Sequence, residues 1–257
     1  MAEFSSENTL RTEDLEETGN LEKTEDLDKT EDLKKTEQKT TIYLVRHGTT
    51  RWNQMLRYQG RADNPLDEEG ERQGACLEDY FREIPIDLGV TSPLQRARKT
   101  LMYCLKGQDH EVPVIVEPDV IEIDFGDIDG LTGEEIKTRY PEFYRMYVLD
   151  EDRGHSQAPG GESLVQVYDR MRDAVLRIAA EHRGEKVVIA SHGTAIQTFL
   201  NYAYGIPAAE MKRFLLYNVS VSCVEISADG RAEVRYIGDK HHVPVELQFS
   251  YGAVPGK

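Results

Sequence analysis

The stretch "TIYLVRHGTTRWN", residues 41–53, places an Arg-His-Gly triplet directly behind a short apolar run. Short runs rich in β-branched residues predict buried strands. A second such run, "KVVIASHG" at residues 186–193, ends in the same His-Gly pair. Ligands of open α/β sheets bind outside the carboxyl ends of the strands. If the two strands are neighbours, His47 and His192 therefore face each other across one crevice.

From Thr41 onward, short apolar runs alternate with segments of helical periodicity, which predicts a mainly parallel sheet with helices on both faces. A terminal hairpin over residues 221–238 is predicted from two alternating runs around the turn sequence Ala228-Asp229-Gly230. The expected fold class is α/β, a three-layer sandwich with a mainly parallel central sheet. The strands are predicted at 41–45, 88–92, 112–117 and 186–191, and the helices near 68–84, 93–106, 133–149 and 161–182.

The composition narrows the class of protein. Hydrophobic residues make up 39% of the 257, enough to bury a sizeable core. Lys and Arg number 31 against 47 Asp and Glu, so the formal net charge is 31 − 47 = −16. A charge of this sign argues against nucleic acid or an anionic membrane as a partner. No apolar run approaches the roughly 20 residues of a membrane span, and three scattered cysteines fit reduced thiols, so we expect a cytoplasmic protein.

The N-terminal region repeats every six residues, with Thr at 12, 18, 24, 30 and 36 and Leu at 15, 21, 27 and 33. The first 40 residues hold 13 acidic and 6 basic side chains. A six-residue step turns a helical side chain by about 240°, so the leucines cannot form a coiled-coil seam. We therefore expect a mostly disordered acidic tail over residues 1–40 and a globular domain over residues 41–257. The alternative is a docking segment for an unidentified partner.

Two arginines and one glutamate lie where the predicted sheet would place a ligand. Arg46 ends the first strand, and Arg96 lies near the start of the helix for which Ser92 is the predicted N-cap and Pro93 the first residue. Guanidinium groups match phosphate oxygens and stay charged, so the two arginines could clamp a tetrahedral dianion. Glu122 lies in "VIEIDFGDIDG", where a carboxyl could protonate a leaving alkoxide and later deprotonate water.

A set of motifs follows in order: "RHG", "WN", "YQGRADNPLDEEGERQ", "SPLQRA", "EIDFGDIDG", "PGGES", "SHG" and "GDKHHV". Arg-His-Gly alone is a weak signal, but the ordered set is highly specific. From about Thr41 to Val243 the chain resembles the histidine phosphatase superfamily, the phosphoglycerate mutase-like proteins. It is most similar to the broad-specificity phosphatases and alpha-ribazole phosphatases of that superfamily.

The resemblance implies a role for each reactive residue. His47 matches the nucleophile, which would become a phosphohistidine, and Glu122 matches the acid and base. Arg46, Arg96 and His192 match the phosphate pocket. Because His47 must be neutral to attack, its other ring nitrogen should donate to a backbone carbonyl. No metal and no cofactor is required. The candidate substrate-binding residues are Asn53, Thr50, Gln59, Gly60, Glu162 and Thr194.

Three positions depart from the pattern that is common in the superfamily. Thr49 replaces a frequent Glu or Gln, Ile128-Asp129 replaces a frequent Trp-Glu, and Gln197 stands where Arg is usual. None of these differences removes a charge that the chemistry uses. They bear on the identity of the substrate.

The segment after Glu122 distinguishes two kinds of enzyme. Mutases of the superfamily have a longer, basic insertion there, whereas only 36 residues separate Glu122 from Pro159 in this chain. We therefore expect a metal-independent phosphomonoester hydrolase for small phosphorylated metabolites, with alpha-ribazole 5'-phosphate as a candidate. Phosphoglycerate mutase is one alternative, and a catalytically silent scaffold that uses the acidic tail is another. A lid packed on the core is predicted from aromatic residues at helical spacing, namely Tyr140, Phe143, Tyr144 and Tyr147.

Overall fold

The computed structural model describes residues 38–248, and the chain divides into two units, Met1–Gln38 and Lys39–Lys257. The disordered tail expected over residues 1–40 therefore falls almost wholly outside the described residues. Thr40, which that expectation included, belongs to the second unit. Its side chain is buried, and its hydroxyl donates to the carbonyl of Ala179 at 2.8 Å.

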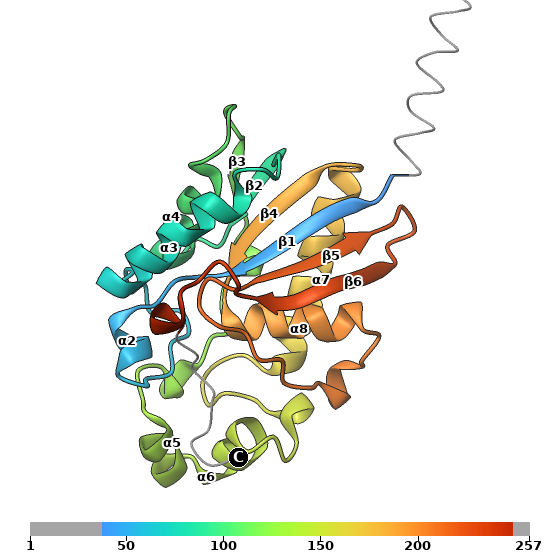
Figure 1. Ribbon diagram of the computed structural model, residues 1–257. Coiled ribbons are helices and arrows are strands. Elements are labelled where there is room, and N and C mark those ends of the chain that lie inside the picture. Colours follow the sequence, from blue (N-terminus) through green and yellow to red (C-terminus); the bar gives the residue numbers. More distant parts are fainter. Residues whose placement is uncertain (1–37, 249–257) are drawn as a thin grey trace, which may run out of the picture. The chain divides into compact units, whose positions relative to one another are not determined.

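A six-stranded sheet forms the centre of the second unit, in the order β3-β2-β4-β1-β5-β6 (Figure 1). The first four strands in this order run parallel, whereas β5 is antiparallel to β1 and β6 to β5. The four predicted strands and the terminal hairpin are confirmed, although β3 is shorter than predicted. The strands are β1 (Thr40–Arg46), β2 (Leu88–Thr91), β3 (Val114–Val116), β4 (Lys186–Ser191), β5 (Val221–Ile226) and β6 (Ala232–Asp239).

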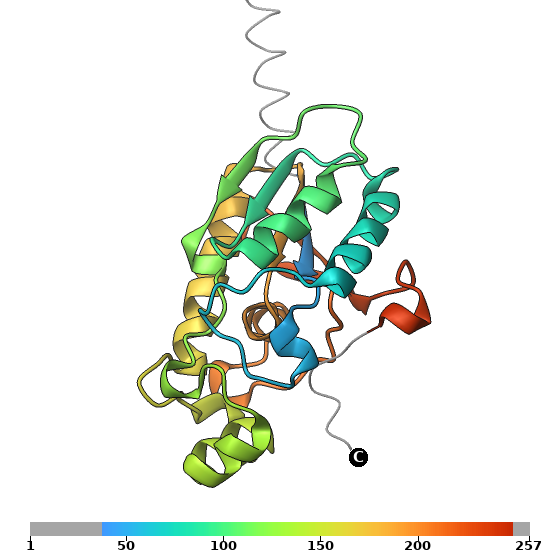
Figure 2. The ribbon, with the colours of Figure 1, turned by 90° about the vertical axis from the view of Figure 1, so that its left-hand side faces the viewer.

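Helices cover both faces of the sheet, so the predicted three-layer α/β sandwich is confirmed. Figure 2 shows α3 and α4 on one side of the sheet and α7 on the other. Successive side chains of β1 pack on opposite faces of the sheet. Tyr43 and Val45 pack with α3 and α4, whereas Ile42 and Leu44 pack with α7 and α8. These helices are α3 (Glu68–Phe81), α4 (Gln95–Leu105), α7 (Leu164–Glu181) and α8 (Gly193–Ala203).

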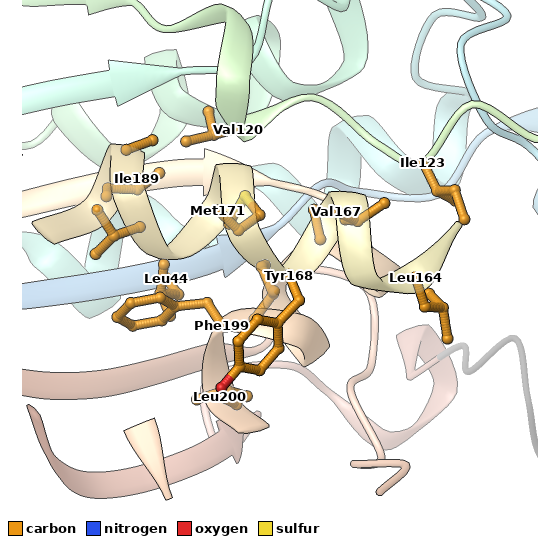
Figure 3. Close-up of a cluster of buried hydrophobic side chains, with 14 of the residues drawn as sticks. Leu44, Val120, Ile123, Leu164, Val167, Tyr168, Met171, Ile189, Phe199 and Leu200 are labelled. Atoms are coloured by element: carbon orange, nitrogen blue, oxygen red, sulfur yellow. The ribbon is translucent and has the colours of Figure 1, made fainter. Parts of the chain in front are cut away.

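The larger core is built around α7. Its residues Leu164, Val167 and Met171 recur at steps of three and four and are fully buried, as an amphipathic helix on a sheet requires. Figure 3 shows this stripe beside Leu44 and Ile189 of the two central strands. Packing of the stripe fixes α7 on the sheet. The helix then lies next to the segment that precedes Glu122, the predicted acid and base.

The segment between the sheet and α7 differs from the prediction. A helix was predicted at 133–149, but the chain forms α5, α6 and a π-helical turn, which lie together beyond the ends of β1 and β4 (Figure 1). Pro141 explains the break, because a proline disfavours helical backbone in the residue before it. Tyr140 accordingly has φ −133° and ψ 59°. The elements are α5 (Gly133–Arg139), α6 (Pro141–Phe143) and η3 (Tyr144–Val148).

The predicted start of α4 is also wrong. Its N-cap is Leu94, not Ser92, and the Ser92 hydroxyl accepts the N–H of Leu94 at 3.3 Å before the helix begins. The helices α2 (Arg51–Gln54) and α8 were not predicted. The remaining short helices are η1 (Pro118–Val120), η2 (Gly126–Ile128), η4 (Arg153–His155), η5 (Ala208–Glu210) and η6 (Val245–Leu247).

A bilayer-crossing helix would have to be both long and apolar, and residues 38–248 contain none that meets both conditions.

Candidate active site

The two His-Gly sequences meet at one edge of the sheet. β1 and β4 are parallel neighbours, with Arg46 opposite Ser191 in the register. His47 follows β1 and His192 follows β4, and their ring centroids lie 5.2 Å apart. The prediction that the two histidines face each other is confirmed.

His47 is held as a neutral imidazole. Its Nδ1 lies 2.7 Å from the carbonyl oxygen of Gly48, which can only accept, so Nδ1 carries the proton and Nε2 keeps its lone pair. Burial, with the charges of Arg96 and Arg46, places the pKa of His47 well below its ordinary value. The predicted bond to a backbone carbonyl is confirmed. The side chain is 3% exposed and lines a pocket, so Nε2 is its one available nucleophilic atom.

His192 has the same tautomer, with its Nε2 held by a side chain. The Ser92 hydroxyl already accepts from the N–H of Leu94, so its single proton can go to His192 Nε2, 2.8 Å away. The imidazole proton is then on Nδ1, which has no hydrogen-bond acceptor within residues 38–248. Burial also lowers the pKa of His192 well below its ordinary value. His192 is therefore a fixed, neutral hydrogen-bond donor beside His47.

Arg96 is a buried cation in the first turn of α4. Its Nη1 and Nη2 donate to the carbonyls of Ala62 and Gly60, both at 2.7 Å. Its Nε has no acceptor in the described part of the chain. Burial lowers the pKa of Arg96 to about 10, so the guanidinium stays charged at neutral pH. Arg46 is also buried, and its Nη1 donates to the carbonyl of Leu216 at 2.6 Å.

Glu122 reaches the same place from the loop after η1. Its carboxylate accepts the N–H of Ile123 at 2.9 Å and the N–H groups of Thr194 and Ala195, in the first turn of α8, at 3.1 and 3.0 Å. Burial nevertheless dominates and raises the pKa of Glu122 above its ordinary value. A carboxyl with a raised pKa keeps its proton to higher pH than an ordinary glutamate, which favours a role as general acid.

These side chains surround a pocket of about 100 Å³. Six of the residues predicted for the site form part of its wall: Arg46, His47, Asn53, Gln59, Glu122 and Thr194. Four other residues predicted for the site are buried and are not part of this wall, namely Arg96, His192, Thr50 and Gly60. Within residues 38–248 no group of three or more His, Cys, Asp or Glu is placed to hold a metal ion.

Gln59 presents an unused donor to this pocket. The Thr50 hydroxyl lies 3.0 Å from Gln59 Oε1, and Asn64 Nδ2 donates to the same oxygen at 2.8 Å. Gln59 Nε2 has no partner among the described residues, although the residue is only 8% exposed. Thr50 caps α2 and exchanges hydrogen bonds with Asn53, so its role is to position the wall.

Glu162 is a predicted site residue whose carboxylate is bound outside the pocket wall. Its carboxylate pairs with Arg170 at 3.0 Å and with Arg61 at 3.1 Å, and it is not part of the pocket wall. The physical reason is that the Gly160-Gly161 turn directs the chain toward the backbone of Asp124, whose N–H the Glu162 carboxylate accepts. Glu162 is therefore a candidate positioning residue rather than a substrate ligand.

Several residues in the wall or bound to His47 carried no sequence signal. Arg57 and Arg213 line the pocket from irregular segments, and Asn218 Nδ2 donates to the carbonyl of His47 at 2.8 Å from the loop before β5. Tyr147 was expected only to pack in a lid. It is buried there, but its hydroxyl also lies 2.9 Å from the hydroxyl of Thr194.

Thr49, for which the sequence offered no role, links two elements. Its hydroxyl donates to Asp67, the N-cap of α3, at 2.9 Å, and its N–H donates to Gln73 at 2.8 Å. The departure from the superfamily pattern at this position thus has a structural explanation.

Comparison with known proteins assigns the class. Residues 42–239 match the family described as the histidine phosphatase superfamily, branch 1. The chain belongs to this superfamily, as its motifs indicated.

Curated relatives include both phosphatases and mutase-like proteins. A bifunctional protein from Mycobacterium tuberculosis is 35% identical over 199 residues, 77% of this chain and 53% of the relative. This chain therefore spans about half the length of that relative. Phosphoserine phosphatase 1 from Hydrogenobacter thermophilus is 31% identical over 185 residues, 72% of this chain and 86% of the relative. The probable phosphoglycerate mutase GpmB from Photorhabdus laumondii is 35% identical over 189 residues, 72% and 84% respectively.

Solved structures share the fold. YhfR from Bacillus stearothermophilus matches with a TM-score of 0.72 at 30% identity, covering 80% of this chain and 100% of the other. The alpha-ribazole phosphatase from Shigella flexneri matches with a TM-score of 0.68 at 26% identity, covering 77% and 96%.

Proposed function

We propose that the protein is a phosphomonoester hydrolase that acts through a phosphohistidine at His47 and needs no metal. The observation that carries the proposal is the neutral His47 imidazole, fixed by its bond to the Gly48 carbonyl and lying beside two buried arginines. Attack on phosphorus needs this lone pair, and the arginines stabilise charge on the equatorial oxygens.

The proposed reaction has two steps. In the first, Nε2 of His47 forms a bond to phosphorus, the ester P–O bond breaks, and Glu122 gives its proton to the leaving alkoxide. In the second, the Glu122 carboxylate takes a proton from water, the water oxygen bonds to phosphorus, and the P–N bond breaks. Inorganic phosphate leaves, and both residues return to their starting protonation states. The raised pKa of Glu122 and the lowered pKa of His47 suit these starting states.

Hydrolysis is favoured over phosphoglycerate mutase chemistry by the short segment between Glu122 and Pro159. Its 36 residues include α5, α6 and η3, and they contribute Phe125, Tyr147 and Val148 to the pocket wall but no lysine or arginine. This segment therefore supplies none of the basic side chains by which the longer insertion of the mutases encloses a bisphosphate primer. Alpha-ribazole 5'-phosphate is a candidate substrate, supported by the structural likeness to a protein of that activity. Three free cysteines in the described residues support our proposal that the protein acts in the cytoplasm.

The test is release of phosphate from 4-nitrophenyl phosphate in the presence of EDTA. We expect turnover by the wild type and none by His47→Ala, with rapid-quench trapping of phosphate on His47. Full activity of His47→Ala would refute the mechanism. A requirement for a bisphosphate primer would identify a mutase, and a wild type that neither turns over nor traps phosphate would identify a scaffold.

A further inference from the structure

The pocket wall also contains residues that take no part in the proposed hydrolysis. Part of the wall is aromatic and includes Tyr58, Phe125 and Tyr147. These three rings pack edge-to-face, with centroids 5.5 to 6.2 Å apart. The same wall includes two arginines that the proposed hydrolysis does not use, Arg57 and Arg213.

Arg57 is held from its outer side. Its Nη1 donates to the carbonyl of Gly130 at 2.6 Å and to Glu135 at 3.3 Å. Glu135 is not part of the pocket wall. The Nε and Nη2 groups of Arg57 have no hydrogen-bond acceptor among the described residues. The guanidinium is therefore anchored by one nitrogen, while its other donors are available to a ligand.

Arg213, in the irregular segment between η5 and β5, is anchored in a similar way. Its Nε and Nη2 contact Asp150, at 3.0 and 2.8 Å, and Nη2 also donates to the carbonyl of Tyr147 at 2.8 Å. Asp150 is not part of the pocket wall. Nη1 of Arg213 has no acceptor within residues 38–248. Both arginines thus line the pocket with their acidic partners lying outside it.

The charges in the pocket exceed what one phosphate needs. Arg46 and Arg96 together balance a phosphomonoester dianion while Glu122 is protonated. Arg57 and Arg213 add two further cations to a wall in which Glu122 is the one carboxylate among the described residues. This local excess stands out in a chain with a net charge of −16. Gln59 Nε2, buried and without a partner in the described part, adds a donor in the same pocket.

We propose that Arg57 and Arg213 form a second anion subsite, so that the preferred substrate is a phosphomonoester carrying a second anionic group. This inference rests on the proposed hydrolysis at His47. The second group is either a carboxylate or a further phosphoryl group, since guanidinium donors bind both. The aromatic part of the wall would contact the carbon chain that joins the two anionic groups of the substrate.

The test compares matched substrates. For the carboxylate, 3-phosphoglycerate is compared with glycerol 3-phosphate, and for the phosphoryl group, fructose 1,6-bisphosphate is compared with fructose 6-phosphate. We expect the wild type to show kcat/KM higher by about tenfold or more for one doubly anionic member than for its partner. The pair that shows the preference identifies the second group. Arg57→Gln and Arg213→Gln should each reduce that ratio toward one.

The matched control is Arg145→Gln. Arg145 lies in η3, is well exposed, pairs with Glu151 at 2.9 Å and is not part of the pocket wall, so the substrate ratio should not change. If a variant fails to fold, calorimetric binding of the same ligand pairs to His47→Ala measures the preference without turnover.

Two outcomes separate this inference from the proposed function. A wild type that hydrolyses 4-nitrophenyl phosphate through His47 but shows ratios near one for both pairs would overturn the second subsite alone. A ratio that survives in both Arg57→Gln and Arg213→Gln would also overturn it. Absence of His47-dependent hydrolysis with every substrate would overturn the proposed function itself.

Discussion

The Arg170 guanidinium and the Glu162 carboxylate form a two-point ion pair, with Nε to Oε1 at 3.1 Å and Nη2 to Oε2 at 3.0 Å. The same guanidinium donates to the main-chain carbonyls of Ile121 and Glu122, at 2.7 and 3.1 Å. Glu162 accepts the N–H of Asp124 at 2.9 Å. The pair therefore holds the main chain on both sides of Glu122 without lining the pocket.

Replacement of Arg170 by Met should misplace Glu122 while leaving His47 intact. We expect kcat/KM for an alkyl phosphate to fall by about 10²-fold, because an alkoxide needs a proton from Glu122 to leave. The fall should be much smaller for 2,4-dinitrophenyl phosphate, whose leaving group needs no proton. Steady-state kinetics with a series of leaving groups measures this difference, since kcat/KM reports transition-state stabilisation from the free enzyme.

Arg172→Met is the matched control for this prediction. Arg172 lies on the same helix and makes its ion pairs with Asp169 and Asp173 on the protein surface. We expect kcat/KM of Arg172→Met to differ little from that of the wild type with any of these substrates. An equal loss for alkyl and aryl substrates in Arg170→Met would show a general structural role and contradict a role in positioning the acid.

Asp129 should control the affinity for phosphate through Arg96. Its two carboxylate oxygens accept the N–H groups of Gly60 and Ala62, at 2.8 and 3.1 Å, and the carbonyls of those residues hold the Arg96 guanidinium. In Asp129→Asn one acceptor becomes a donor facing an N–H group, which costs about 1–3 kcal/mol when buried. We expect the inhibition constant of inorganic phosphate to rise by about tenfold.

Exposed Asp127, two residues earlier, supplies the comparison. Asp127→Asn should leave phosphate inhibition within about twofold of the wild type, because surface substitutions away from such networks usually have small effects. Equal inhibition constants for Asp129→Asn and the wild type would exclude the proposed link to Arg96.

The parts of the fold that could be predicted are those with strong local periodicity. β1 and β4 are buried on both faces, so their sequences form continuous apolar runs, and α7 has a clean apolar stripe. α8 could not be recognised, because its N-cap is His192, which makes no side-chain capping bond. Its sequence "GTAIQTFLNYA" is also largely buried and has no charged residue, so it lacks the charged outer face of α3, α4 and α7.

The same distinction applies to the residues of the site. Arg46 and His47 could be predicted because they directly follow a recognisable strand. Arg57 and Arg213, which line the pocket, and Asn218, which binds the His47 carbonyl, could not, since they come from irregular segments whose course depends on tertiary packing. Glu162 was assigned to the substrate because its motif lies near the site in relatives, but its contacts are with the support of Glu122.

Gly126 is expected to be essential for the loop that carries the acid. It has φ +48°, and a Cβ there would lie 2.3 Å from the carbonyl oxygen of Pro159. Gly126→Ala should therefore destabilise the protein by about 2 kcal/mol or more. For a domain of this size that corresponds to a fall in Tm of about 4–8 °C, measurable by calorimetry.

Gly133→Ala provides the control for Gly126→Ala. No atom lies within 4 Å of a Cβ at Gly133, which is the first residue of α5, so alanine should be neutral or slightly stabilising there. Equal Tm values for the two variants would contradict the steric argument.

The pH dependence should depend on the leaving group. Glu122 must be protonated to assist an alkoxide, and burial raises its pKa, so assistance is present at low pH and is lost as pH rises through that raised pKa. His47 must be neutral, and burial beside Arg96 and Arg46 lowers its pKa, so it stays active below its ordinary value of 6.5. Turnover of alkyl phosphates should therefore be greatest on the acidic side of neutrality.

The ratio of kcat/KM for an alkyl ester to that for 2,4-dinitrophenyl phosphate isolates the contribution of Glu122. Both substrates need neutral His47, and both carry a phosphate that ionises. Much of the pH dependence from these two sources therefore cancels in the ratio. Above the pKa of Glu122 the ratio should fall about tenfold for each pH unit, because the protonated fraction falls by that factor. In Glu122→Gln the ratio should be low at every pH. A wild-type ratio that does not change between about pH 5 and 9 would assign the leaving-group proton to another donor.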